Sequence, residues 1–413
     1  MSYLLYLIIL SGYIFSRGFF ATGSVSVLLC ATLLYILYFL RNGAFRKEFI
    51  SREQLLVVLC LFSIVVYGGL YQGNSWLVYL SYFLLMLNFI LGLLLIGKST
   101  FIPAKRIVIF MLAIALSVRL FMIWSSPDPY IDVYDYLKNG ALAFVSGQNP
   151  YTVNYARYYQ NVIPDYYSYL PGMVYLTLPI VLIFHDPRYT FILAEFLAAY
   201  FIFKMTEKSK SSYIYPLLFL ANPISPYMIE QSYTEPLILC LLLLFGWLSL
   251  KPKNILSATV FGLVLSTKQY ALFLLPLFLK LIGNFRKTIP MIIGVFTTII
   301  LIVAPFFFWN PSDFWHDAIS LQLTFGPRYE GLTFFSLLYR FGFGYSVYLS
   351  LLIICLFLIF IYRRKVNNLA AFFSLSSFVF FALFFFNKWA FMNYYYLISQ
   401  LFLAGAVLRE NEI

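Results

Sequence analysis

Long apolar runs separated by short polar segments dominate the chain. Runs long enough to cross, or nearly cross, a bilayer lie at about 3–16, 18–40, 54–71, 76–97, 107–124, 169–184, 189–203, 212–228, 235–250, 255–283, 289–308, 345–362, 367–386 and 391–408. We expect the run at 255–283 to hold two short helices. Several runs are shorter than the ~20 residues of a perpendicular crossing, so some must be tilted, re-entrant or membrane-flush. The pattern predicts an all-α polytopic membrane protein with roughly 12 to 14 crossings.

The composition supports a membrane protein. Of the 413 residues, 62% are hydrophobic and 11% are charged, whereas soluble proteins have about 45–50% and about 25%. So few charged residues could not cover a soluble body of this size, and the same figures exclude disorder, collagen and a disulfide scaffold. The four cysteines all lie inside apolar runs and indicate small core residues rather than disulfides or metal ligands.

The net charge of +12 comes mainly from short loops between the apolar runs. Such loops orient membrane helices with their basic residues in the cytoplasm, which is a better explanation here than a nucleic-acid partner. The basic residues concerned are Arg41, Arg46, Lys47, Arg52, Lys98, Lys105, Arg106, Lys251, Lys253, Arg286, Lys287, Arg363, Arg364 and Lys365.

The opposite, external face is then expected to hold two long polar loops, 125–168 and 309–330, and several shorter segments between helices. A basic cluster at 204–210 does not fit this alternation, because two apolar runs separate it from the external loop 125–168. Either one of the two runs lies flat in the membrane interface, or this cluster is external.

The loop 125–168 contains the densest group of polar residues. Asp132 and Asp135 are three residues apart and would share one face of a helical turn. An aspartate at the mouth of a membrane helix is partly desolvated, so its pKa can be adjusted for general-base work. Asp128 and Asp165 are better explained as residues that solvate the loop. The sequence from Gly147 to Tyr151 predicts a helix end followed by a rigid turn.

Three other polar groups interrupt apolar sequence on the expected external side. Glu235, followed by Pro236, is either a carboxylate at a helix N-terminus or a substrate ligand. Lys268 lies between two apolar runs, where a lysine is costly unless it is paired, and a bound anion is the expected partner. Lys388 and Asn393 lie among aromatic residues, where an interfacial aromatic belt is the alternative to a functional role.

Other chemistries have little support. The two histidines, His185 and His316, have no paired metal-ligand spacing, and no phosphate-binding glycine loop or Ser-His-Asp arrangement is present. The sequence indicates no cofactor and gives no sign of a divalent metal. The 35 tyrosines could stack on sugars, but membrane belts use the same residues.

Several short motifs together resemble the GT-C class of integral-membrane glycosyltransferases. They are the acidic pair at 132–135, the G-x-x-P-Y turn at 147–151, the Y-x-Y-x-P segment at 167–171, the T-K-Q…P stretch at 267–276 and the F-N-K…N-Y-Y segment at 386–395. The spacing is most similar to the first mannosyltransferase of GPI-anchor assembly and to bacterial polyprenyl-phosphate-mannose-dependent enzymes. The resemblance covers roughly residues 107–408, which implies N-terminal membrane helices in 1–100 followed by a GT-C-like catalytic module in 101–413. The chain departs from the class in lacking a D-x-D motif and in having about four extra helices before the acidic loop.

The resemblance implies an inverting transfer of a hexose, with mannose favoured, from a polyprenyl-phosphate donor to a glycan, lipid or protein hydroxyl. It implies an active site on the external face of a membrane, with the plasma membrane of a prokaryote favoured, and no nucleic-acid partner. Asp132, or else Asp135, would be the general base. The donor phosphate would be bound by Lys268, Gln269, Arg328 and Lys388, and the substrates by Gln148, Asn149, Tyr151, Tyr169, Glu235, Asn393 and Tyr394. The alternative is a flippase or transporter of lipid-linked saccharides, which would use the same anionic-lipid cavity without a base.

Overall fold

The described residues of the computed structural model form helices joined by turns. They comprise residues 2–41, 49–73, 75–97, 102–155, 166–209, 211–251, 255–283 and 285–411. Within these ranges there is no β-strand, and a single isolated bridge pairs Phe19 with Gly331. The predicted all-α class is therefore confirmed. Some charged residues discussed above lie outside the described ranges, namely Arg46, Lys47, Lys98, Asp165, Lys210 and Lys253. For Arg286 and Lys287 the backbone is described but the side chain is not.

A helix or a pair of helices occupies each predicted apolar run. The helices are α1 (Ser2–Ile14), α2 (Thr22–Leu40), α3 (Arg52–Val66), α4 (Trp76–Ile96), α5 (Ala104–Ser125), α7 (Gly172–Phe184), α8 (Arg188–Thr206), α9 (Tyr215–Leu220), α10 (Ser225–Glu230), α11 (Glu235–Ser249), α12 (Ile255–Leu265), η2 (Gln269–Leu274), α13 (Leu275–Ile282), α14 (Phe285–Trp309), α18 (Val347–Tyr362), α19 (Leu369–Phe385) and α20 (Met392–Glu410). Five of them, α2, α4, α5, α8 and the part of α14 from Ile289, are long and apolar enough to cross a membrane. The chain is thus compatible with a polytopic membrane protein.

The loops predicted to be external carry short helices of their own. They are α6 (Asp132–Val145), η1 (Pro150–Thr152), α15 (Pro311–Trp315), the π-helical turn η3 (His316–Ser320), α16 (Leu321–Thr324) and α17 (Phe334–Arg340). The predicted helix end before the G-x-x-P-Y turn is confirmed. Gly147 adopts φ +78°, a conformation that favours glycine, and the Asn149 side chain then accepts from the backbone of Tyr151 to start η1.

The run at 212–228 was predicted as one segment but is broken into α9 and α10. Proline accounts for the break, because Pro223 lies between the two helices and Pro226 occupies the first turn of α10. Backbone carbonyls freed at such a break need partners when no water is near. They receive them from three other helices: Gln400 donates to Phe219 O, Arg119 to Leu220 O and Ser63 to Ala221 O.

Arg119 of α5 also forms a fully buried ion pair with Glu195 of α8. The hydroxyls of Ser225 and Tyr396 donate to the same carboxylate. This network joins four helices in the interior and leaves neither charge unpaired, as a buried pair requires.

Helices α19 and α20 form the centre of the bundle and are almost entirely buried. The N-terminal helices pack directly on them. Tyr13 of α1 is 2.8 Å from Ser399 Oγ, and Tyr35 of α2 is 2.7 Å from Ser377 Oγ. The described residues of 2–97 therefore share one hydrophobic core with the rest of the described chain.

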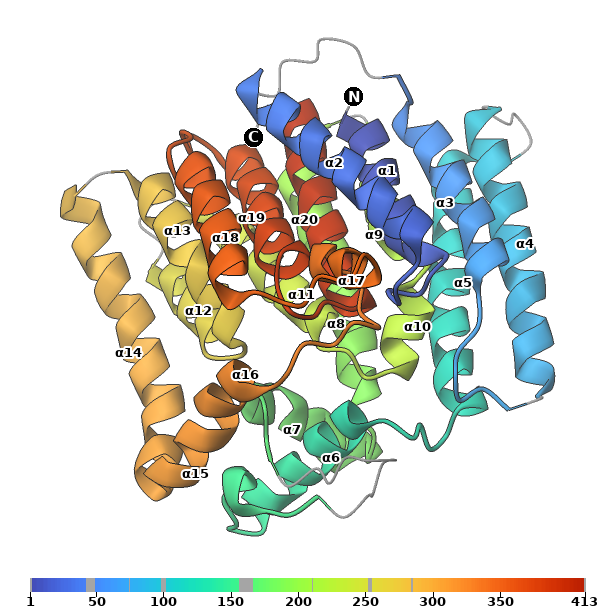
Figure 1. The fold of residues 1–413 in the computed structure, drawn as a ribbon. Helices are drawn as coiled ribbons and strands as arrows, with labels where there is room; N and C mark the ends of the chain where they lie inside the picture. Colours follow the sequence, from blue (N-terminus) through green and yellow to red (C-terminus); the bar gives the residue numbers. More distant parts are fainter. Residues whose placement is uncertain are drawn as a thin grey trace.

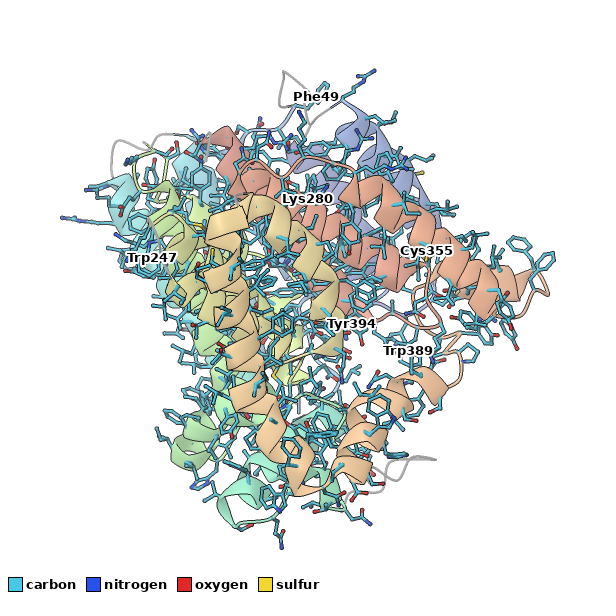
Figure 2. The ribbon with its side chains drawn as sticks, turned by 90° about the vertical axis from the view of Figure 1, so that its left-hand side faces the viewer. Phe49, Trp247, Lys280, Cys355, Trp389 and Tyr394 are labelled. Atoms are coloured by element: carbon cyan, nitrogen blue, oxygen red, sulfur yellow. The ribbon has the colours of Figure 1, made fainter. Side chains whose placement is uncertain are left out.

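The helix ends divide between two ends of the bundle (Figure 1). Both termini lie at one end, together with the ends of α2, α4 and α18 that precede basic loops. Contacts agree with this arrangement, because Arg52 pairs with Glu410 and Lys280 donates to the carbonyl of Arg364. Helices α6 and α15 lie at the opposite end (Figure 1). In the view of Figure 2, Lys280 and Phe49 lie near the first end, and Tyr394 and Trp389 lie further toward the second.

Candidate active site

A cavity of about 480 Å³ lies beside the start of α6. Its walls come from eight parts of the chain: the α1–α2 turn, the α3–α4 loop, the start of α6, the segment 166–169, the region 227–233 and the segments around 268–270, 322–328 and 389–394. Pockets of this size commonly bind small molecules or parts of larger ones. Seven residues predicted from the sequence line this cavity, namely Asp132, Tyr169, Lys268, Gln269, Arg328, Asn393 and Tyr394.

Asp132 is the first residue of α6 and its carboxylate is half-buried. Its Oδ1 accepts a hydrogen bond of 2.8 Å from the backbone N–H of Val133. Desolvation raises the pKa of Asp132 above the ordinary aspartate value, and the hydrogen bond from Val133 and the positive charge of Arg328 oppose the rise. A raised pKa makes the carboxylate a better proton acceptor, as a general base requires.

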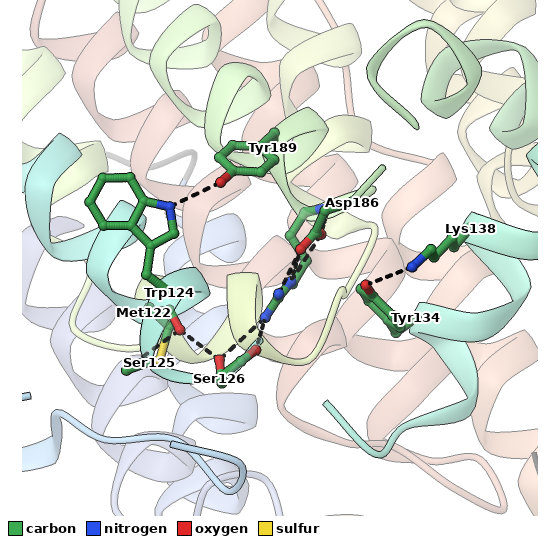
Figure 3. A network of polar contacts seen from close by, with 9 residues as sticks. Met122, Trp124, Ser125, Ser126, Tyr134, Lys138, Asp186 and Tyr189 are labelled. Atoms are coloured by element: carbon green, nitrogen blue, oxygen red, sulfur yellow. Dashed lines mark hydrogen bonds and ion pairs between the residues drawn. The ribbon is translucent and has the colours of Figure 1, made fainter. Parts of the chain in front are cut away.

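A buried arginine fixes the segment that leads into α6. Arg188, at the start of α8, binds both carboxylate oxygens of Asp186 and donates to the carbonyl of Ser126 at 2.7 Å. The guanidinium also lies 5.3 Å from the ring of Tyr134 in the first turn of α6. Figure 3 shows this network joining Ser126 and Asp186, with Tyr134 and Lys138 beside it. The end of α5, the start of α8 and the start of α6 are therefore held together next to Asp132.

Lys268 has a protein partner, contrary to the expectation that its partner is a bound anion. Its Nζ is 3.1 Å from Oε1 of Glu235, and the two side chains are 9% and 0% exposed. Tyr270 and Asn393 donate to the same Oε1, at 3.2 and 2.9 Å. Sequence reasoning missed the pair because Glu235 opens α11, 33 positions before Lys268.

The pair borders the cavity. Lys268 lines the cavity and lies 4.8 Å from the ring of Tyr169. Among the described residues, Oε2 of Glu235 is buried with no hydrogen-bond partner. Glu235 thus lies in the first turn of α11 and supports the cavity wall through Lys268.

Arg328 and Gln269 border the cavity through different contacts. Arg328 forms an exposed ion pair with Glu330 at 2.6 Å, and its guanidinium lies over the ring of Phe391. Gln269 uses its side-chain amide to join Ser168 O and Ala318 O, at 3.1 and 2.6 Å. Gln269 therefore holds the segment 166–169 and η3 together, whereas Arg328 keeps an exposed cationic group at the cavity.

Four of the other predicted residues do not share this cavity. The ammonium of Lys388 donates to the carbonyls of Leu323 and Phe325, at 2.9 and 2.7 Å, and so fixes the end of α16. Asp135 is buried one turn beyond Asp132, outside the cavity lining, which favours Asp132 as the base. Gln148 and Asn149 line a separate hollow.

Tyr151 belongs to a buried aromatic cluster, and its hydroxyl donates to Tyr169 O at 2.6 Å. The G-x-x-P-Y turn therefore supports the cavity wall from behind.

A second link behind the wall is Asp317 of η3, which accepts from the backbone N–H of Tyr167 at 2.8 Å. Burial raises the pKa of Asp317. The two long polar loops are joined through this contact.

Sequence reasoning did not identify Tyr71, Tyr233 or Gln231 as cavity residues. Each lies in a segment that sequence alone marks only as a turn beside a membrane helix. The Asp-Pro-Arg sequence at 186–188, a buried charge pair at a helix start, carried a signal that could have been found.

Among the described residues, no group of three or more His, Cys, Asp or Glu side chains is arranged to hold a metal ion. No family model, no curated protein and no solved structure matches the chain.

Proposed function

We propose that this protein is an inverting glycosyltransferase of the GT-C type, which moves a hexose from a polyprenyl phosphate to a hydroxyl acceptor. The observation that carries the proposal is one cavity lined by a carboxylate, Asp132, and by two cations, Lys268 and Arg328. Inverting transfer needs a base for the acceptor and positive charge for the leaving phosphate. Mannose is the favoured hexose, on the resemblance of the short motifs alone.

In the proposed reaction, Asp132 takes the proton of the acceptor hydroxyl. The acceptor oxygen then bonds to the anomeric carbon, and the bond between that carbon and the phosphate oxygen breaks. The phosphate leaves on the opposite face of the sugar with its bonding electron pair, so the configuration inverts. Lys268 and Arg328 would stabilise the negative charge that develops on it.

The proposed membrane arrangement places the cavity near the external surface. The 15 residues of α11 span about 22 Å from Ser249 to Glu235, and the hydrocarbon core is about 30 Å thick. The Glu235–Lys268 pair would then lie in the outer part of the bilayer, close to the depth of a lipid phosphate. The favoured location is the plasma membrane of a prokaryote.

In this arrangement α7 lies flat in the interface and packs on α6, because a single crossing, by α8, then separates the external loop 125–168 from the basic residues 204–210. Residues 204–210 are then cytoplasmic. If α9 and α10 together make one crossing, and η2 and α13 another, the count is about fourteen, within the range expected from hydropathy.

The test is a transfer assay with purified protein in proteoliposomes, run over a panel of radiolabelled polyprenyl-phosphate sugars. The proposal predicts transfer of at least one sugar to a hydroxyl acceptor, with inversion at the anomeric carbon. Absence of transfer and of donor hydrolysis across the panel would overturn it.

A lipid-linked-saccharide transporter is the second candidate. The break between α9 and α10 supports it, because transporters often use broken helices at membrane depth. However, the described carbonyls at this break are bonded to Gln400, Arg119 and Ser63, which leaves them unavailable to a substrate. A transporter should retain most of its activity after Asp132→Asn, whereas a transferase should lose it.

A further inference from the structure

The α3–α4 loop belongs to the cavity although it precedes the GT-C-like region. Its residues Leu70 and Tyr71 line the cavity, and their backbone N–H groups donate to the carboxylate of Glu230 at 2.7 and 2.9 Å. Glu230 is fully buried at the end of α10. A Cβ atom at Gly69 would lie 1.9 Å from Glu230 Oε1, so only glycine allows this approach.

The same loop is tied to the segment that leads to Asp132. The backbone N–H of Gly73 donates to Ser125 O at 2.9 Å, and Gln72 Nε2 donates to Ser125 Oγ at 3.1 Å. The hydroxyl of Tyr71 donates to Tyr130 O at 2.6 Å, two residues before Asp132. The loop therefore has a fixed position relative to Asp132.

Two groups of residues in the cavity lining are held by separate sets of contacts. Lys268 lies 4.8 Å from the ring of Tyr169 and pairs with Glu235 at 3.1 Å. Tyr71 is held by Glu230 through its backbone N–H and by the carbonyl of Tyr130, two residues before Asp132, through its hydroxyl. Lys268 and Tyr71 thus belong to different groups in the lining that Asp132 shares.

The part of the cavity at Tyr71 has the chemistry of a saccharide subsite. The rings of Tyr71 and Tyr227 line it, and rings of this kind can stack on the apolar face of a sugar. Gln231 lines it as well and donates its Nε2 to Glu230 at 2.8 Å. Among the described contacts, Oε1 of Gln231 accepts no hydrogen bond and is free for a sugar hydroxyl. The guanidinium of Arg17 lies over the ring of Tyr227, 5.6 Å from its centroid.

We propose that Tyr71, Tyr227 and Gln231 form the acceptor subsite and that the acceptor is a saccharide. The proposal rests on the function proposed above. If the donor phosphate binds beside Lys268, the acceptor must approach the anomeric carbon from the opposite face of the sugar, and the group of residues held by Glu230 and the α3–α4 loop would receive it. The α3–α4 loop, which precedes residue 101, would then take part in the choice of acceptor.

The test measures transfer from the polyprenyl-phosphate sugar that serves as donor to octyl α-mannoside and, in a separate arm, to a serine- and threonine-containing peptide. Tyr71→Ala should raise the KM for octyl mannoside roughly tenfold, the loss of about 1.4 kcal/mol of binding. The donor KM should stay the same. Tyr71→Phe keeps the ring and should restore most of the affinity, and Gln231→Ala should also raise the acceptor KM. The matched control is Tyr79→Ala, a 72% exposed tyrosine on α4 outside the cavity lining.

The outcomes separate the two proposals. If the wild-type protein neither transfers sugar nor hydrolyses donor, the proposed function fails and the subsite fails with it. If the wild-type protein transfers sugar but Tyr71→Ala and Gln231→Ala leave the acceptor KM unchanged, only the subsite is overturned. Transfer to the peptide and not to the mannoside would overturn the saccharide acceptor. A parallel rise in donor KM would show that these residues do not form a separate acceptor side.

Discussion

Removing one member of the buried Glu235–Lys268 pair should destabilise the protein far more than removing both. Both side chains are nearly inaccessible, at 0% and 9% exposure, and Nζ lies 3.1 Å from Oε1. Loss of one partner from such a pair leaves an uncompensated buried charge and typically costs about 3–5 kcal/mol. We expect Glu235→Gln to reach this range, because Lys268 has no other carboxylate among its described contacts.

Lys268→Met should cost less than Glu235→Gln. The carboxylate would keep its hydrogen bonds from Tyr270 and Asn393, at 3.2 and 2.9 Å. The double variant, with neither charge, should lose about 2 kcal/mol or less, since replacing a buried pair by uncharged groups is often close to neutral. The two substitutions are therefore expected to be strongly non-additive.

The assay is a double-mutant cycle on the free energy of unfolding, measured by reversible SDS titration in mixed micelles. The matched control is the cycle for Lys204 and Glu207, an ion pair exposed at 29% and 48%, where the coupling should stay within about 0.2–1 kcal/mol. Additive effects for Glu235 and Lys268, or single variants that each cost under about 1 kcal/mol, would show that the buried pair is not energetically coupled as expected.

Three further predictions concern topology and packing. In a background without the native cysteines, a cysteine introduced by Ser146→Cys should react with an impermeant thiol reagent in intact cells, and labelling only after permeabilisation would reverse the proposed orientation. Gly69→Ala should cost about 1–3 kcal/mol of unfolding free energy through its clash with Glu230. Gly23→Ala is the control, because no atom lies within 4 Å of the added Cβ. Equal effects of the two substitutions would contradict a tight contact between the α3–α4 loop and Glu230. Arg188→Met should destabilise the protein by about 3–5 kcal/mol, because it leaves the Asp186 carboxylate without its partner. A thermal or SDS unfolding curve like that of the wild type would show that the contacts of Arg188 with Asp186 and Ser126 are dispensable.

Local sequence was sufficient for the positions of the helices. Hydropathy located each apolar run, and Gly147 marked the end of α6 because a glycine in the left-handed region is a local property. The interruption of 255–283 at Lys268 was also predictable, whereas the division of its second half into η2 and α13 was not predicted. The break at 221–224 was missed although Pro223 and Pro226 mark it in the sequence. Its carbonyl partners, Arg119 among them, lie far along the chain and could not be predicted.

The cavity was predicted only in part. Asp132 was identified as an acidic residue in a polar loop at a helix mouth, and Lys268 and Asn393 as polar residues in apolar surroundings; the structure places all three in one cavity. The direction of a side chain was not predictable: Lys388 turns to the carbonyls of α16 rather than to the cavity. Contacts between distant segments were not predictable either, since the hydrogen bond from the α3–α4 loop to Glu230 joins residues about 160 positions apart.

The most direct test of Asp132 as the general base is the rate of sugar transfer by Asp132→Asn. The control is Asp128→Asn, since Asp128 is an exposed aspartate outside the cavity lining. A general-base role predicts that Asp132→Asn loses about 10²–10⁴-fold in rate, the usual contribution of such a base, with expression and unfolding unchanged. Because burial raises the pKa of Asp132 and only the ionised carboxylate accepts a proton, the wild-type rate should fall as the pH drops through that raised pKa. The Asn variant should lack this dependence. Transfer by Asp132→Asn at a rate near that of Asp128→Asn and the wild type, with the acid limb intact, would contradict the assignment of Asp132 as the base.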